Sequence, residues 1–508
     1  MLAEQTKSNE SRYIVRPTLP TRCEGQDALL YPPTDTLVLS FTMHGAWVLP
    51  TSIDIQRYMA ALSNTLSIFA PVAGRLCKKP DTEKGKGDIF LKLNNAGVPV
   101  SVVNDYHTER FPMETVLVSP EDFEPWIDPI PFTDVIDHDE PLVRIRFTKL
   151  HKTGQMIYTI CWLHALGDGY IGNLFTTYIA HFYRGANISN LPIPSYTKVF
   201  LPPPPADPAI AEKFLPLMKH LRDAKSPEEL IPLILQSEER TTPVHISFTS
   251  AQIQTLTKRA TAGVPGSAVA KLSRVDVLVA YLILQHNQVV SELHPDQELI
   301  DTVVNTIDYR GNPAFAPPVM FGNAAITLTC PSFSLPSLPP NAGPRDHELH
   351  FDRCLAAIAL SIRAGTLQAR NPEFLGTYLS FHNALCRKCY QEGLYQNLLP
   401  ASDREITFNS SHLVDWRKGG DLFDPDSEFA GIRYIQFHSS ALFERYIRVF
   451  RTNPAYIVAD DGTGGYWDMS LNDGLEAAFR LDSSIAERFV ARTKEDTKRG
   501  FSRVFSNL

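Results

Sequence analysis

Residues 156–163, Met-Ile-Tyr-Thr-Ile-Cys-Trp-Leu, form a run without a charged side chain. A run of this length, rich in β-branched and aromatic residues, predicts a strand that is buried on both faces of a sheet. His164 opens the turn that follows, His-Ala-Leu-Gly-Asp-Gly, and apolar side chains at helical spacing over 170–182 predict a helix after it. Open α/β sheets bind ligands at the carboxyl ends of such strands. We therefore expect His164 and Asp168 to lie beside a functional site.

The chain is too long for one hydrophobic core, and its elements fall into two α/β sets of similar size. A stiff polyproline stretch at 201–205 opens a crossover, in which we expect an amphipathic helix over 209–224. The predicted organisation is a first domain at 1–205, a linker at 206–243 and a second domain at 244–508.

Periodicity predicts further elements along the chain. Residues 89–93 and 98–103 alternate like the strands of a hairpin, and Ser52 and Ser273 are expected N-caps. The other expected strands are 37–41, 142–150, 244–248, 299–307, 432–437, 456–458 and 466–471. The other expected helices are 51–66, 250–260, 275–287, 351–364 and 475–489.

Composition and charge disfavour several classes of protein. The net charge of −8 argues against a nucleic-acid-binding protein, which usually carries a basic stripe. No apolar stretch is long enough to predict a transmembrane helix, and the polar first residues contain no secretory core. Seven scattered cysteines, with one isolated C-x-x-C pair at Cys386 and Cys389, predict a reduced, cytoplasmic chain without a metal site.

Five segments carry a more specific signal. They are Leu-Ser-Ile-Phe-Ala-Pro-Val-Ala-Gly-Arg-Leu at 66–76, His-Ala-Leu-Gly-Asp-Gly at 164–169, Ser-Arg-Val-Asp-Val-Leu-Val-Ala at 273–280, Val-Asn-Thr-Ile-Asp-Tyr-Arg-Gly-Asn at 304–312 with Phe-Gly-Asn-Ala at 321–324, and Gly-Gly-Tyr-Trp-Asp-Met-Ser-Leu at 464–471. In this order they resemble the motifs of the BAHD family, the H-x-x-x-D type of acyl-CoA-dependent acyltransferases. One motif departs from the family pattern. Where the family carries D-F-G-W-G, the nearest match is Glu428-Phe429-Ala430-Gly431.

The resemblance implies an α/β fold of two similar domains, each a mixed β-sheet flanked by helices as in chloramphenicol acetyltransferase. An active-site channel would lie between the domains. The implied reaction transfers an acyl group from acyl-CoA, a co-substrate, to a hydroxyl or amine of a small molecule, without a tightly bound cofactor or a metal. The pattern is that of a divergent fungal member from secondary metabolism, and we expect a cytoplasmic monomer.

The resemblance also implies roles for individual residues. A thioester is already activated, so the remaining need is a base that takes the proton of the acceptor, and His164 is that base. Asp168 is expected to point away from the cavity and to form an ion pair with Arg310. Gly169 would have a backbone role, and Glu428 would support the site from within the altered motif. The expected residues of the channel wall are Trp416, Asn409 and Ser410.

Two other readings remain open. A condensation-type enzyme would use acyl groups tethered to a carrier protein, but such enzymes usually carry a second histidine where Leu163 stands. A binding scaffold without turnover would be expected to lack His164 or Arg310, and both are present. A serine hydrolase is disfavoured because no G-x-S-x-G elbow occurs.

Overall fold

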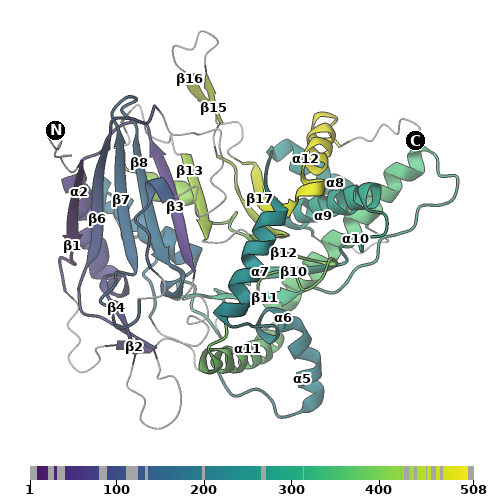
Figure 1. Cartoon of the computed structure of the whole chain (residues 1–508), viewed down its shortest axis with the longest axis horizontal. Helices are drawn as coiled ribbons and strands as arrows, with labels where there is room; N and C mark the ends of the chain where they lie inside the picture. Colours follow the sequence, from purple (N-terminus) through teal and green to yellow (C-terminus); the bar gives the residue numbers. More distant parts are fainter. Residues whose placement is uncertain are drawn as a thin grey trace, which may run out of the picture.

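The computed structural model describes residues 9–20, 28–30, 41–78, 89–109, 124–131, 135–196, 201–264, 271–312, 314–424, 426–427, 434–439, 443–453, 455–458, 465–468 and 473–501. Two six-stranded mixed sheets, each flanked by helices, make up most of this part of the chain (Figure 1). The α/β fold class expected from the sequence is confirmed.

Each sheet combines strands that are far apart in the chain. The first sheet contains, side by side in this order, β1 (Glu10–Val15), β6 (Val98–Asp105), β7 (Val143–Leu150), β8 (Met156–Leu163), β3 (Thr42–Leu49) and β13 (Tyr434–Ser439). The second contains, in the same manner, β11 (Ala325–Thr329), β10 (Thr302–Asp308), β12 (Glu405–Ser410), β14 (Tyr446–Arg451), β17 (Leu475–Asp482) and β9 (Thr241–Phe248). Two small sheets consist of β2 (Ala28–Leu30), β5 (Ile89–Lys92) and β4 (Arg75–Lys78), and of β15 (Ala455–Val458) and β16 (Gly465–Asp468).

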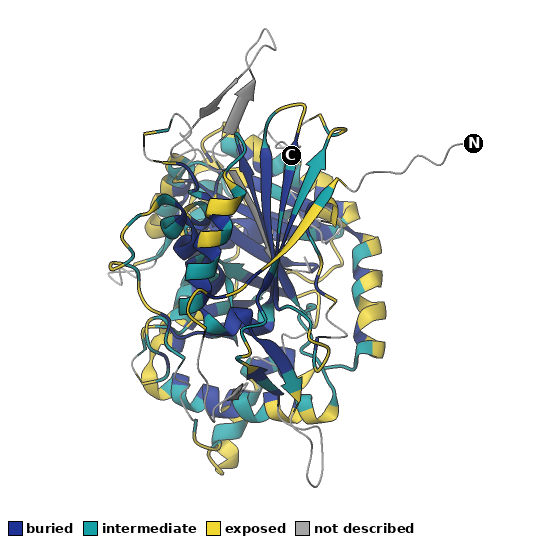
Figure 2. Cartoon of the chain, turned by 90° about the vertical axis from the view of Figure 1, so that its left-hand side faces the viewer, coloured by how far each residue is buried: buried dark blue, intermediate teal, exposed yellow. Residues whose placement is uncertain are grey.

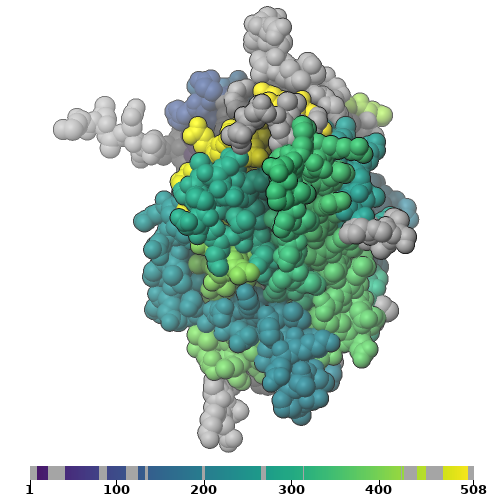
Figure 3. Space-filling model, turned by 90° about the vertical axis from the view of Figure 1, so that its right-hand side faces the viewer, coloured from purple at the N-terminus to yellow at the C-terminus, as the bar shows by residue number. Residues whose placement is uncertain are grey.

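Helices pack on both sheets. The face seen in Figure 3 is formed mostly by the later part of the chain, coloured from teal to yellow. The α-helices are α2 (Ile55–Ile68), α4 (Gly169–Arg184), α5 (Pro208–Phe214), α6 (Lys219–Arg222), α7 (Pro227–Arg240), α8 (Ser250–Ala262), α9 (Arg274–Leu293), α10 (Pro344–Arg370), α11 (Pro372–Glu392) and α12 (Ser483–Lys498).

β8 lies in the interior of the first sheet, as its apolar run predicts. All eight of its residues are buried, and its neighbours are β7 and β3. Figure 2 shows buried strands in the middle of the molecule and exposed residues on the surrounding helices. The Tyr58 hydroxyl of α2 donates to the Tyr158 hydroxyl at 2.9 Å, and the Tyr158 ring stacks on Trp47 of β3 with 4.7 Å between centroids. These contacts fix the strand that ends directly before His164.

Helix starts follow local side-chain chemistry. Ser273 caps α9 in a capping box with Asp276, which confirms the predicted N-cap. The predicted cap of α2 is wrong, because Asp54 rather than Ser52 accepts the backbone N–H groups of the first turn. A carboxylate at this position also gains from the positive end of the helix dipole.

Three predicted elements are wrong for separate physical reasons. β5 and β6 do not form a hairpin, because Gly97 has a φ of 93° and turns the chain from the small sheet to the first sheet. Pro216 divides the helix expected at 209–224, because proline lacks the N–H that a helix interior needs. The stretch expected as one helix at 475–489 is β17 followed by α12, with Asp482 as the N-cap.

Several elements were not predicted. They are strands β1, β2, β4, β11, β12 and β14 and helices α7 and α11. β3 begins at Thr42, and most of the strand expected at 37–41 lies outside the described residues.

The second half of the chain contributes to the first sheet. After β12 the chain reaches the 3₁₀ turn Trp416–Gly420, and β13 then pairs antiparallel with β3 before the chain returns to β14, the neighbour of β12. The Trp416 carbonyl accepts a hydrogen bond from Trp47 Nε1 at 2.9 Å. The predicted domain boundaries at 205 and 243 therefore stay a prediction, because β13 lies beyond residue 243 in the sequence but belongs to the first sheet.

The packing of the turn Trp416–Gly420 against Trp47 gives a first testable prediction. A Cβ atom at Gly420 would overlap the Trp47 indole, so Gly420→Ala is expected to lower the free energy of unfolding by about 1–3 kcal/mol. Gly172 in α4 is the matched control, because its Cβ would lie 3.9 Å from Met43 and 4.0 Å from Trp416, which are ordinary contacts. Gly172→Ala is expected to raise stability by about 0.5–1 kcal/mol. Urea unfolding that shifts both midpoints in the same direction would contradict this packing.

Candidate active site

A cavity of about 230 Å³ lies between the two sheets. The first half of the chain contributes a small part of its wall, namely Phe41, Met43, His164, Asp168, Gly169 and Tyr170. The rest comes from β10, β11, β12, β14, α6, α11 and the loops between them. The cavity thus collects the end of β8 from one sheet and three neighbouring strands, β10, β12 and β14, from the other.

The backbone around His164 is held on several sides. Its N–H donates to the Phe41 carbonyl at 2.9 Å, and its carbonyl accepts from Asn323 Nδ2 at 3.0 Å and from the Gly167 N–H at 3.1 Å. A Cβ at Gly167 would lie 3.1 Å from the Ile171 side chain, so a larger residue would press on α4. The turn therefore fixes the direction in which the His164 side chain leaves the strand.

The imidazole of His164 lies on the cavity wall, and in the described part of the chain one of its two nitrogens has no hydrogen-bond partner. Its Nδ1 is buried, and within the described part of the chain no group forms a hydrogen bond with it. Burial lowers its pKa below the ordinary 6.5 and outweighs the opposing effects of its own backbone, the negative charge of Asp168 and the Asn323 side chain; the positive charge of Arg448 adds a smaller lowering. A neutral imidazole on a cavity wall can accept a proton from a bound ligand.

The rate of any reaction that uses His164 as a base is expected to depend on pH in one direction. A base acts only when unprotonated, and the lowered pKa extends the neutral form to pH values below 6.5. We expect kcat/KM to stay level from about pH 8 to about pH 6.5 and to fall only in more acidic buffer. Circular dichroism at each pH must show a folded protein. If kcat/KM fell in acid with an apparent pKa above about 7, the result would contradict a buried, neutral base.

Asp168 and Arg310 are in direct contact behind this turn. Asp168 Oδ2 accepts from Arg310 Nη1 at 2.7 Å and from the Ala324 N–H at 3.0 Å, while Oδ1 accepts from the Tyr170 N–H at 3.2 Å and caps α4. The side chains of Asp168 and Arg310 are only 15% and 4% exposed. Both carboxylate oxygens are thus directed to partners other than His164, so Asp168 positions the turn.

Arg310 ties together the two halves of the chain. Its guanidinium donates to the Gly322 carbonyl at 2.6 Å and the Met320 carbonyl at 3.2 Å, and it lies 3.4 Å from Asp308 Oδ1. Burial alone would lower its pKa, but the charges of Asp168 and Asp308 outweigh burial and raise it. The charged form is therefore stable inside the protein.

The other residues expected at the site are in different environments. Asn409 and Ser410, at the end of β12, line the cavity, as does Gly169 at the start of α4. The Trp416 side chain is 7% exposed and belongs to the core of the first sheet, and it is not among the residues of the cavity wall. Glu428 lies outside the described residues.

Sequence reasoning missed the contribution of β14. Tyr446, Arg448 and Phe450 alternate along this strand and all line the cavity. The period-two pattern of Tyr-Ile-Arg-Val-Phe-Arg is the signal that could have identified the strand. His220 of α6 and His382 of α11 also line the cavity and were not predicted.

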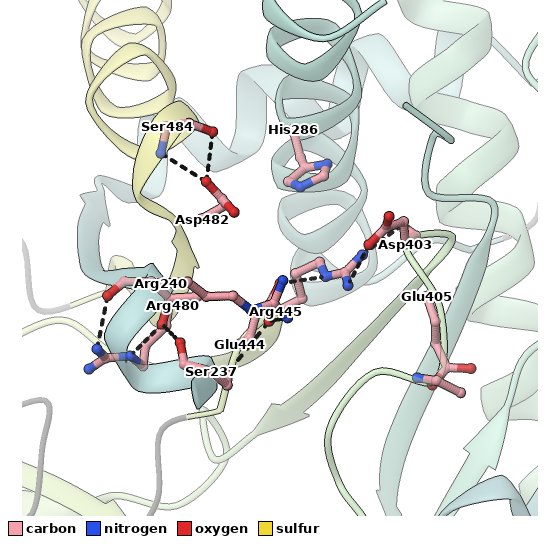
Figure 4. Close-up of polar contacts among 12 residues, drawn as sticks. Ser237, Arg240, His286, Asp403, Glu405, Glu444, Arg445, Arg480, Asp482 and Ser484 are labelled. Atoms are coloured by element: carbon pink, nitrogen blue, oxygen red, sulfur yellow. Dashed lines mark hydrogen bonds and ion pairs between the residues drawn. The ribbon is translucent and has the colours of Figure 1, made fainter. Parts of the chain in front are cut away.

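The start of β14 is anchored by a network of charged residues (Figure 4). The Arg445 guanidinium donates to the Asp403 carbonyl at 2.6 Å, and Glu444 forms an ion pair with Arg240 and accepts from Ser237 at 3.4 Å. The Arg445 backbone bonds the chain on both sides, since its N–H donates to the Arg480 carbonyl and its carbonyl accepts from the Thr407 N–H, both at 2.9 Å. This network fixes the register in which alternate residues of β14 face the cavity.

The described part of the chain lacks two other kinds of feature. None of the helices in the described ranges is long and apolar enough to cross a membrane. Among the described residues, no group of three or more His, Cys, Asp or Glu side chains is arranged to hold a metal ion.

One family model matches the chain, and several solved structures share its fold. Residues 25–334 match the Transferase family. Vinorine synthase has a TM-score of 0.60 at 15% identity, over 95% of this chain and 97% of that chain. TRI101 of F. sporotrichioides, complexed with coenzyme A and T-2, has a TM-score of 0.60 at 13% identity, over 93% of this chain and 98% of that chain. TRI101 of F. graminearum, complexed with coenzyme A and T-2 mycotoxin, has a TM-score of 0.59 at 13% identity with the same coverage. No curated protein matches the chain by sequence.

The described part of the chain has two mixed sheets with a cavity between them, and the solved structures have this same fold. The family match covers more than half of the chain and includes the His164 turn and Arg310. The chain belongs to the Transferase family, the BAHD acyltransferases that its motifs resemble, and it is an acyltransferase.

Proposed function

We propose that this protein transfers an acyl group from an acyl-CoA thioester to a hydroxyl or amine of a small molecule, with His164 as the general base. The observation that carries the proposal is a buried, neutral imidazole on the wall of a cavity between two sheets. Coenzyme A and T-2 mycotoxin are both bound in a TRI101 structure of the same fold, which supports a thioester donor and a small-molecule acceptor.

The proposed reaction needs one proton shuttle. The acceptor O–H or N–H transfers its proton to the His164 imidazole while its oxygen or nitrogen attacks the thioester carbonyl carbon. The tetrahedral intermediate then collapses, the carbon–sulfur bond breaks, and the departing thiolate of CoA takes the proton from the imidazolium. Histidine is regenerated, and no metal or covalent enzyme intermediate is required. The protein contributes a fixed base and a cavity that holds both substrates in line.

The proposal also covers the oligomeric state and the metabolic role of the enzyme. We propose that the enzyme acts as a monomer in secondary metabolism, as the fungal character of its motifs suggests. The match with TRI101, seen with a mycotoxin, supports this setting. Light scattering of the purified protein would test the monomer, with a mass near 56.8 kDa as the expected result.

A donor panel tests the reaction. Acyl-CoA thioesters from acetyl to long-chain and aromatic are mixed with an extract of hydroxylated and amino metabolites, and release of free thiol is followed. We expect extract-dependent release with at least one donor, and a rise in melting temperature when CoA is added. His164→Ala is the matched control, which should still show the thermal shift but release thiol at least about a hundredfold more slowly. No release together with no thermal shift would favour the carrier-protein or scaffold reading.

A further inference from the structure

Two imidazoles besides that of His164 line the active-site cavity. His220 belongs to α6 and His382 to α11, two helices that pack against each other (Figure 1). Both residues are buried, and their ring centroids are 6.0 Å apart. His220 and His382 together form one region of the cavity wall, which we call the imidazole patch.

Contacts behind the imidazole patch hold its two residues in place. The His220 carbonyl accepts a hydrogen bond from the Asn397 N–H at 2.9 Å, which ties α6 to the loop before β12. The His382 ring stacks on that of Tyr378, one turn earlier in α11, with 5.9 Å between centroids. The Tyr378 hydroxyl in turn donates to the Thr327 carbonyl of β11 at 2.6 Å. The two imidazoles are therefore fixed in the wall before a substrate arrives.

The protein leaves hydrogen-bonding groups of the imidazole patch unsatisfied. Within the described part of the chain, neither ring nitrogen of His220 makes a hydrogen bond. The His382 ring has one polar contact there, the Cys386 thiol, which lies 3.5 Å from Nδ1 and 3.9 Å from Nε2 and can satisfy only one of them. The Gln396 side chain, on the same wall, makes no hydrogen bond with the described residues either. Polar groups in an enclosed wall need a partner, which a bound ligand can supply.

The elements that carry the imidazole patch add no charge to the described cavity wall. α6, α11 and the loop before β12 contribute His220, Leu379, His382, Gln396 and Leu398 to it. Burial lowers the pKa of His220 to about 3 and that of His382 to about 4, so both rings are neutral at neutral pH. The charged residues of the described wall come from the His164 turn, from the end of β10 with the loop after it, and from β14.

The chemistry of the imidazole patch matches that of a hydroxyl group. A neutral imidazole has one N–H that donates and one nitrogen that accepts, and a glutamine amide also does both. A hydroxyl is complementary to such groups, because its oxygen both donates and accepts. A carboxylate only accepts and an ammonium only donates, and burial of either beside neutral groups is costly. The patch therefore favours an uncharged hydroxyl.

We propose that the imidazole patch binds a hydroxyl of the acceptor that does not react, so that this acyltransferase selects acceptors with a hydroxyl in addition to the group that is acylated. The inference rests on the proposed function and adds the acceptor class to it. His164 takes the proton of the reacting group, while His220 and His382 hold another part of the same molecule. They determine specificity and position the acceptor, and neither ring gains or loses a proton during the reaction.

Matched acceptors test the inference with the donor that the panel identifies. Hydroquinone and resorcinol carry a second hydroxyl, para-cresol and meta-cresol carry a methyl group in its place, and para- and meta-hydroxybenzoate carry a carboxylate there. We expect kcat/KM of the wild type for the diphenol of at least one set to exceed that for the cresol by at least about tenfold, because the methyl group leaves the imidazoles without a partner. The hydroxybenzoate should react no faster than the cresol. The acylated product formed from the extract should likewise keep at least one hydroxyl, as its mass and nuclear magnetic resonance spectrum would show.

Substitutions then assign the preference to the imidazole patch. The ratio of kcat/KM for diphenol over cresol is expected to approach one in the double variant His220→Phe with His382→Phe, which keeps the rings but removes their nitrogens. It should survive in part in His382→Gln, which keeps a donor and an acceptor. The KM for the acyl-CoA should stay at the wild-type value in each variant. The control is His138→Phe, since His138 is exposed and is not part of the described cavity wall, and its ratio should equal that of the wild type.

Several results would overturn the inference. They are a wild-type enzyme that uses diphenol and cresol equally in both sets, a preference for the diphenol that persists in the double variant, and an extract product without a remaining hydroxyl. A rise in the KM for the acyl-CoA rather than for the acceptor would also overturn it, because the patch would then bind the arm of CoA that carries amides and a hydroxyl.

The experiment stays decisive if a variant does not fold or turnover is slow. The wild-type ratio alone tests the preference, and thermal shifts of the wild type by each set of acceptors give the same comparison without turnover. Absence of both thiol release and a CoA shift marks failure of the proposed function. Thiol release, or a CoA shift, without any preference for the second hydroxyl marks failure of this inference alone.

Discussion

Replacing His164 with alanine is expected to lower kcat/KM by about 10²–10⁴-fold, the usual contribution of a general base. The physical reason is that the acceptor must lose its proton as it attacks, and the other two imidazoles of the described cavity wall, His220 and His382, are on α6 and α11 rather than at the end of β8. The melting temperature should change little, because the fixed contacts of this turn are made by the His164 backbone rather than by its imidazole.

The measurement is steady-state thiol release with the donor found in the panel, at saturating and limiting acceptor. The control variant is His151→Ala, because His151 lies in the turn before β8, at the other end of the strand, and contacts Asn104 at 2.9 Å. It should retain wild-type kinetics. If the His164 variant kept more than about a tenth of the wild-type kcat/KM while folded, the assignment of the base would be wrong.

The parts of this fold that could be predicted from sequence are those in which neighbours along the chain carry the signal. The unbroken apolar run of β8 predicts a buried strand, and the Ser273 capping box predicts the start of α9. In each case the physical cause acts within a few residues, so a single sequence contains it.

The parts that could not be predicted depend on pairing between distant segments. β5 and β6 alternate as any two strands would, and only the positive φ of Gly97 directs them to different sheets. β13 joins the first sheet although it lies late in the chain, and no local pattern specifies that partner. A tryptophan such as Trp416 fits a channel wall or a core equally well, and its contact with Trp47 places it in the core.

The residues of the candidate site also fall into those that the sequence predicts and those that depend on pairing between distant segments. The motifs contain His164, Asp168 and Arg310, and the pair of Asp168 with Arg310 joins segments 142 residues apart. Arg448 was missed because it joins the cavity wall through the pairing of β12 with β14, which sets Asn409 beside it. Family motifs therefore contain the groups that the proposed reaction needs, while other residues of the cavity wall are brought to it only when the sheet is assembled.

Replacing Asp168 with alanine is expected to lower the free energy of unfolding by about 3–5 kcal/mol, because Arg310 would keep a buried charge without its closest carboxylate. The control is Asp308→Asn, whose side chain is 51% exposed and lies 3.4 Å from the same guanidinium. It should lower stability by less than about 1 kcal/mol. Both values come from urea unfolding followed by circular dichroism, and loss of equal stability in the two variants would contradict the buried pair.

Activity separates a positioning role for Asp168 from a proton relay. Its oxygens bond Arg310, the Ala324 N–H and the Tyr170 N–H, and they make no hydrogen bond with His164 in the described part of the chain. We therefore expect Asp168→Asn to lower kcat by loosening the turn while the acidic limb of the pH profile stays below 6.5. The double variant Asp168→Ala with Arg310→Met should be more stable than Asp168→Ala alone, because the second substitution removes the buried charge that lost its closest carboxylate. The removal of a direct hydrogen-bond partner of His164 would shift the apparent pKa of the acidic limb. If Asp168→Asn shifted it by that much, Asp168 would be part of the proton path and would do more than hold the turn.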